Sequence, residues 1–115
     1  MELNSFLDKL AQAPESVEFE ETMAVIDANY SFTPTAFTNG NTHNQADQNN
    51  GSCKIFAFAQ LNQLQPAATL ACFGQYYRDD VLGNPQGEDH ANIRNFIQYG
   101  WQGIEFSGNA LVAKS

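Results

Sequence analysis

One segment of the chain is apolar on nearly every side, and it limits the fold more than any other feature. It reads CKIFAFAQLNQ from residue 53, with apolar side chains at positions 55, 56, 58, 59 and 61. On a helix these positions point in nearly all directions. Such a helix lies at the centre of a core, because it has no face that can be left in water. We therefore expect a central helix that starts after Ser52, its N-cap, and runs to about residue 63.

Four further segments have the spacing of amphipathic helices. Phe6, Leu7 and Leu10 form the apolar stripe of the first, and Asp89 is expected to cap the last. Pro66 suits the first turn of the third. The predicted helices cover residues 5–13, 20–30, 66–82 and 90–99.

The Thr- and Asn-rich stretch between the second and third predicted helices lacks helical spacing. Asn39-Gly40 is a strong hairpin signal, so residues 35–39 and 41–44 are expected to be short strands. Ile104 and Phe106 alternate with polar residues, which predicts a last strand over residues 104–107 that joins the hairpin. The prediction is an α+β fold, mainly helical with about five helices and a small antiparallel sheet, in a single domain over residues 1–115.

Charge and length exclude several classes of function. The chain has 115 residues, 43% of them apolar, and a net charge of −8. So many acids disfavour binding to nucleic acid or to an anionic membrane face. No apolar run reaches the roughly 20 residues of a membrane span, and the N-terminus lacks the basic region of a secretory signal peptide. Cys53 and Cys72 are expected to be reduced thiols of a cytoplasmic protein.

Several long motifs resemble the HopJ type III effector family. They are ETMAVIDANYSFTPTAF, NGSCKIFAFAQL, TLACFGQYYRDDVLGNP and DHANIRNFIQYGW, and the resemblance covers residues 14–108. It implies a relation to proteins that plant pathogens inject into host cells by type III secretion, where the partner would be a host protein. It implies no catalytic residue. Since a capped helix is expected by residue 5, we favour the bacterial cytoplasm over secretion into a host cell.

Cys53 follows a Gly-Ser step in the expected first turn of the central helix. The helix dipole and Lys54 would favour its thiolate there. With His90 or His43 as base and Asp27 as orienting acid, the chain holds the parts of a cysteine hydrolase. The alternative is that Cys53 is a small core residue, as free cysteines commonly are. The sequence favours the start of a helix first and a nucleophile second.

The acidic residues offer two further candidate sites. Asp27 lies at or beside the apolar stripe of its helix, so we expect Arg78 or Arg94 to pair with it. A second group surrounds the turn at residues 83–87, and it needs an arginine or a divalent cation to offset its charge. Its members are Asp79, Asp80, Glu88, Asp89 and His90. The spacing matches no known metal motif, so we expect neither a metal nor a cofactor.

Binding is therefore the function that we expect, rather than enzymatic activity. The ligand would be an unidentified protein partner or a small molecule, and nucleic acid and membrane are not expected partners. The alternative function is a small cysteine hydrolase that uses Cys53, His90 and Asp27.

Overall fold

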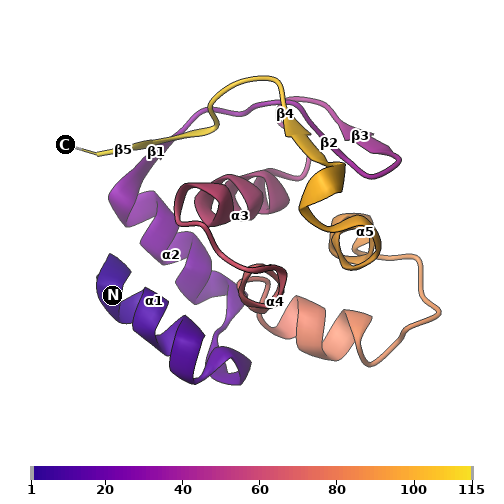
Figure 1. Cartoon of the computed structure of the whole chain (residues 1–115), viewed down its shortest axis with the longest axis horizontal. Helices are drawn as coiled ribbons and strands as arrows, with labels where there is room; N and C mark the ends of the chain where they lie inside the picture. The colour runs from indigo at the N-terminus through magenta and orange to yellow at the C-terminus, as the bar shows by residue number, and fades with distance from the viewer. Residues whose placement is uncertain (1, 115) are drawn as a thin grey trace.

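The computed structural model describes residues 2–114 and places the helices around α3 (Asn50–Leu61). In Figure 1, α1 (Leu3–Gln12) and α2 (Phe19–Asn29) lie on one side of α3, and α5 (Ala91–Tyr99) lies on the other. The short helix α4 (Pro66–Ala71) and the π-helix η2 (Tyr76–Val81) complete the set of helices around α3. Two single 3₁₀ turns follow α1 and α5, namely η1 (Pro14–Ser16) and η3 (Gly100–Gly103).

Strands from the first half of the chain pair with strands near its end in two small antiparallel sheets. In the first, β2 (Phe37–Asn39) lies between β3 (Thr42–Asn44) and β4 (Ile104–Phe106), with Phe37 opposite Phe106. The predicted hairpin, the last strand and the α+β class are therefore confirmed. The second sheet pairs β1 (Tyr30–Phe32) with β5 (Leu111–Ala113), and the sequence did not predict it.

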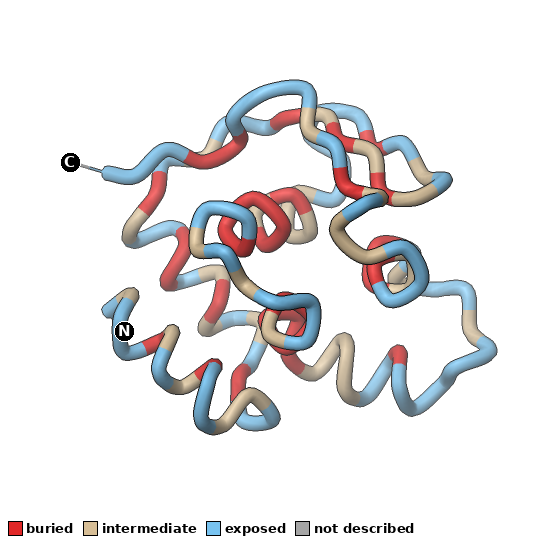
Figure 2. The backbone as a smooth tube through the Cα atoms, viewed as in Figure 1, coloured by how far each residue is buried: buried red, intermediate tan, exposed pale blue. Residues whose placement is uncertain are grey.

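The core forms around α3, as its apolar pattern predicts. The ring of Phe56 is fully buried and lies 5.1 Å from that of Phe96 and 5.5 Å from that of Phe73, measured between centroids. Phe58 meets Phe6 and Tyr30 edge-on from the other side. Each such ring contributes about 1.5–3 kcal/mol through burial. Figure 2 shows the middle of α3 buried, whereas its two ends are intermediate or exposed.

Two helices begin at residues other than those predicted. Asn49 is the N-cap of α3 and His90 that of α5, with φ of 52° and 53° in the left-handed region. Ser52 and Asp89 are not the caps, so both predictions were wrong. Asparagine tolerates the left-handed region better than most residues, and histidine is also enriched there.

The helix predicted over residues 66–82 is interrupted, which corrects the sequence prediction. α4 ends at Ala71, and Gly74 has a φ of +61° before η2 begins. A Cβ atom on Gly74 would lie 2.4 Å from the backbone nitrogen of Phe19, so only glycine allows this approach. The Thr22 hydroxyl donates to the Cys72 carbonyl at 2.8 Å and fixes the same contact.

Candidate functional site

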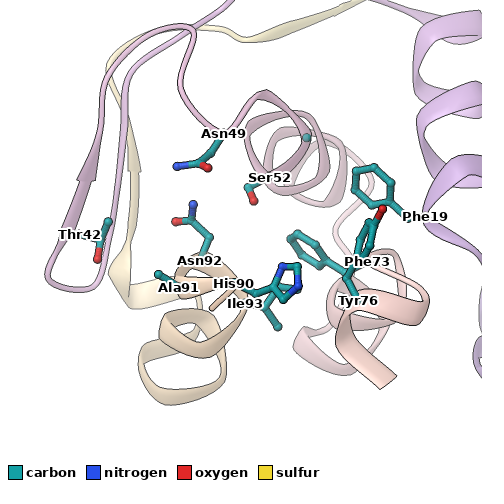
Figure 3. A pocket seen from close by; sticks show the side chains of 11 residues that line it. Phe19, Thr42, Asn49, Ser52, Phe73, Tyr76, His90, Ala91, Asn92 and Ile93 are labelled. Carbon is teal, nitrogen blue, oxygen red and sulfur yellow. The ribbon is translucent and has the colours of Figure 1, made fainter. Parts of the chain in front are cut away.

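A pocket of about 350 Å³ opens where the starts of α3 and α5 face η2. Figure 3 shows its side chains, which come from segments far apart in the sequence. They are Phe19, Thr42, Asn49, Gly51, Ser52, Phe73, Tyr76, His90, Ala91, Asn92 and Ile93. The volume falls within the range of small-molecule sites, which is about 300–1,000 Å³.

Aromatic rings form one wall of the pocket. The ring of Tyr76 lies 5.0 Å from that of Phe19 in an edge-on contact, and it stacks on the imidazole of His90 at 5.4 Å. Tyr76 is the first residue of η2, so the π-helix sets the position of this ring. π-Helical turns are frequent at functional sites. The wall gives a flat apolar ligand a surface on which to pack.

The starts of two helices form the opposite side. Neither α3 nor α5 has a side-chain hydrogen bond from its N-cap. The first backbone bond of α3 is donated by Cys53 to Asn49 at 3.0 Å, and that of α5 by Ile93 to His90 at 3.0 Å. The amides of Gly51, Ser52, Ala91 and Asn92 come before these bonds and find no acceptor within residues 2–114. They are donors at the positive ends of two helix dipoles.

Asparagines hold the two helix starts and the hairpin together beneath the pocket. Asn92 donates to Asn44 Oδ1 at 3.0 Å and accepts from Asn39 at 3.0 Å and from Asn44 at 3.2 Å. Asn49 also donates to Asn44 Oδ1, at 2.7 Å. In Figure 3 the amides of Asn49 and Asn92 face each other across this side. We call these four residues the asparagine network. Asn39 Oδ1 is buried without a partner within residues 2–114. The other side-chain bonds of the network run mainly between its members, so the network fixes how α3, α5 and the hairpin meet.

His90 and two of the acidic residues near it, Asp80 and Asp89, are paired at the rim. His90 Nε2 lies 3.0 Å from Asp80 Oδ2, which ties α5 to η2. Arg94 binds Asp89 Oδ1 at 2.7 Å and also the carbonyls of Asp89 and Asn84. The hydrogen bond and charge of Arg94 lower the pKa of Asp89. Arg94 is therefore one of the offsetting groups that the sequence left open. Within residues 2–114 no group of three His, Cys, Asp or Glu is arranged to hold a metal ion.

Cys53 lies behind the pocket, in the core. Its residue is 1% exposed, and its thiol donates to the Thr35 carbonyl at 3.4 Å. Because α3 begins at Asn50, the amide of Cys53 is already bonded within the helix, and its predicted place in a free first turn was wrong. Burial is the main cause that raises the pKa of this thiol. The neutral thiol is therefore favoured over the thiolate that a nucleophile needs.

The other two members of the predicted hydrolase set have separate partners. Asp27 is exposed and pairs with Lys54 at 2.9 Å, so the prediction of an arginine partner was wrong. His90 pairs with Asp80, as described above. Among residues 2–114, no hydrogen bond or ion pair joins Cys53, His90 and Asp27 to one another. Their use in catalysis stays a prediction, and the reactivity of Cys53 tests it.

Sequence reasoning missed most of the pocket. Of its lining residues, His90 was singled out in advance as a site residue and Ser52 as a helix cap. The signal for the asparagine network was present in the polar stretch at residues 39–50, which has five asparagines and was interpreted as a hairpin followed by a loop. The contribution of Asn92 carried no local signal, because its partners lie about fifty residues upstream.

The solved structure of a related protein has the same fold. The chain is 65% identical to VPA0580, a protein of unknown function, whose crystal structure superposes with a TM-score of 0.98. The match covers 99% of this chain and 95% of that one. A search of curated proteins gave no match.

Two remaining findings concern the whole chain. Within the described residues, no helix is both long and apolar enough to cross a bilayer. The model of the HopJ type III effector protein family matches residues 3–111, which is nearly the full length. The chain therefore belongs to the HopJ type III effector protein family.

Proposed function

We propose that this protein acts by binding a small molecule in the pocket between α3 and α5. The observation that carries the proposal is the pairing of an aromatic wall with four free backbone amides across about 350 Å³. Left-handed residues at both helix starts, Asn49 and His90, support it further. Strained positions of this kind cluster at ligand sites.

The lining specifies the chemistry of the ligand. The amides at the helix starts and the hydroxyl of Ser52 call for a hydrogen-bond acceptor, and the helix dipoles favour a negative one. The rings of Phe19 and Tyr76 call for a flat apolar part. We therefore propose a ligand that carries a carboxylate or phosphate next to an aromatic or similarly flat group.

The net charge of −8 opposes an anionic ligand at long range. This opposition is screened beyond a Debye length of about 8 Å at physiological salt. At the rim, Arg94 offsets the charge of Asp89, and Asp80 is hydrogen-bonded to His90. Binding of an anion should therefore strengthen when salt rises from very low to physiological concentration, which is the reverse of a site formed by lysines and arginines.

Chemical-shift titration with small probes tests the proposal. Benzoate has both a flat ring and a negative charge, benzamide has the ring without the charge, and inorganic phosphate has the charge without the ring. Comparing the three separates the contribution of the ring from that of the charge. We expect benzoate to shift the amide resonances of Gly51, Ser52, Ala91 and Asn92, and benzamide to shift them less at equal concentration. If none of the three probes moves these four amides more than amides on α1, the proposal is wrong.

A pair of variants links the shifts to the pocket. Ala91→Leu places a larger side chain at the pocket wall and should abolish the benzoate response. Ala11→Leu makes the same change at an exposed position of α1 and should leave the response unchanged. Equal responses in the two variants would place the binding outside the pocket.

Family membership supports a further proposal on location and partner. We propose the bacterial cytoplasm as the place of synthesis and storage, and type III secretion into a host cell as the route to a host protein partner. A translocation reporter fused to residues 1–25 tests the route. Delivery that requires an intact secretion system supports it, and a reporter retained in the bacterium contradicts it.

A further inference from the structure

The chain contains two Asn-Gly steps, Asn39-Gly40 and Asn50-Gly51. In such a step the backbone nitrogen of the glycine can attack the side-chain carbonyl carbon of the asparagine. Glycine allows this because it has no side chain to hinder the approach. The two steps have equally favourable local sequences, so the structure decides which of them reacts.

Asn39-Gly40 is protected in three ways. The side chain of Asn39 is fully buried, and its Nδ2 donates to the Asn92 carbonyl at 2.8 Å. The nitrogen of Gly40, which would be the attacking atom, donates to the Gly103 carbonyl at 2.9 Å. The ring of Tyr99 covers Gly40 so closely that a Cβ atom there would lie 2.2 Å from it. Reaction at this step requires the hairpin to separate from α5.

Asn50-Gly51 lacks these restraints. The nitrogen of Gly51 has no acceptor in the described part of the chain, because the first bond of α3 is donated by Cys53. Nδ2 of Asn50 is held only by the exposed carboxylate of Asp47, at 3.0 Å. Oδ1 of Asn50 is buried and has no partner within residues 2–114. Oδ1 of Asn39 is buried without a partner as well, so this atom does not distinguish the two steps, whereas the free Gly51 nitrogen and the exposed partner of Nδ2 do.

We propose that Asn50-Gly51 is a site of spontaneous deamidation at the edge of the pocket. Opening of the first turn of α3, which has no side-chain cap, lets the Gly51 nitrogen bond to Asn50 Cγ. The Cγ–Nδ2 bond breaks, and ammonia leaves with the proton from the Gly51 amide. Water then opens the resulting five-membered imide at either carbonyl, which gives aspartate or isoaspartate at position 50. No oxidant or reductant takes part.

Either product changes the wall that α3 contributes to the pocket. A carboxylate at position 50 faces Asp47 where the amide now donates to it, so a hydrogen bond is replaced by repulsion. Isoaspartate also adds a carbon to the backbone, which moves Gly51 and Ser52 relative to α5. The site thus lets a slow, irreversible reaction alter the first turn of α3.

Peptide mass spectrometry of the native protein, incubated in mildly alkaline buffer, tests the proposal. Conversion at Asn50 should be at least about tenfold faster than at Asn39, because opening a helix end costs far less than opening the core. In denaturant the two rates should become similar, which serves as the control for local sequence. Equal rates in the native protein, or conversion at Asn39 alone, would overturn the proposal, as would a native Asn50 that stays intact while the denatured one converts.

Two variants secure the assignment without depending on ligand binding. Asn50→Ser should remove the acidic species that native ion exchange resolves during incubation. Gly51→Ala should slow their formation, although its methyl group meets the Phe19 ring at 2.9 Å and the variant needs a check of folding. Acidic species that form at the wild-type rate in folded Asn50→Ser would show that position 50 is not their source.

Discussion

The middle of α3 and its start lie in opposite surroundings. Around Phe56 and Phe58, six other aromatic rings pack at centroid distances between 5.1 and 6.3 Å. Around Asn49 and Ser52, the helix meets a pocket whose floor is a network of amides. The first region needs only apolar side chains of suitable size, whereas the second needs particular partners in particular orientations. Removal of atoms should therefore affect stability most in the middle, and changes of polarity should matter most at the start.

The largest expected effect is the protection of the two thiols. Cys53 and Cys72 are both buried, and burial raises the pKa of Cys72 to about 12. In the native protein we expect both to react with a neutral disulfide reagent at least about a thousandfold more slowly than in denaturant, because the core must open first. Absorbance of the released thiol measures both rates. Rapid modification of Cys53 in the folded protein would revive the hydrolase hypothesis.

Truncation in the middle of α3 comes next. Phe56→Ala should lower the free energy of unfolding by about 3–5 kcal/mol, because the ring is fully buried and the cavity cannot close. Urea denaturation measures the loss. Leu61→Ala changes the exposed end of the same helix and should cost less than about 0.5 kcal/mol. Similar losses in the two variants would mean that α3 is not the centre of the core.

Gly74 tests the contact that separates α4 from η2. Gly74→Ala should cost about 1–3 kcal/mol from the left-handed φ alone, and the clash with Phe19 adds to it. Gly108→Ala is the matched control, since a Cβ atom there finds only an ordinary contact at 3.8 Å. The melting temperatures of the two variants, compared with that of wild type, measure the two losses of stability. A neutral Gly74→Ala would show that the break between the helices is not imposed by the backbone of Phe19.

The asparagine network should respond to polarity without a change of size. Asn92→Asp keeps the shape but replaces the donor to Asn44, so we expect a loss of about 1–3 kcal/mol. Asn41→Asp makes the same change on the exposed hairpin turn and should be nearly neutral. Denaturant midpoints compare the two. If Asn92→Asp is as stable as wild type, the start of α3 does not depend on the network.

The smallest effect is expected at the ion pair between α1 and α2. Lys9 binds both carboxylate oxygens of Glu21 at 2.8 Å and lowers the pKa of Glu21 below its ordinary value. The pair therefore stabilises the fold above the ordinary pKa of 4.5, and this contribution disappears as pH falls through the lowered pKa. Lys9→Met should cost about 0.2–1 kcal/mol at neutral pH. The free energies of unfolding of wild type and Lys9→Met are measured as a function of pH. If their difference is as large in acid as at neutral pH, the ion pair is not its cause.

The contrast along α3 also explains what could be predicted from the sequence. Apolar spacing predicted the central helix and the strand at Ile104, because burial leaves a periodic pattern in neighbouring residues. The break at Gly74 depends on the backbone of Phe19, about fifty residues away, and leaves no such pattern. A polar residue such as Asn92 is expected on the surface of its helix. It is buried here because the side chains of Asn39 and Asn44 hydrogen-bond to it. The pocket consists mainly of such distant pairs.

The loop between η2 and α5, at the rim of the pocket, offers a position for a fluorescent label. The contacts of His90 with Asp80 and of Arg94 with Asn84 close the base of an exposed loop, so its tip at Pro85 and Gln86 projects freely. Both natural cysteines are buried, and Gln86→Cys would therefore offer a reactive thiol at a chosen place. A fluorophore attached there would report on the neighbouring pocket without occupying it.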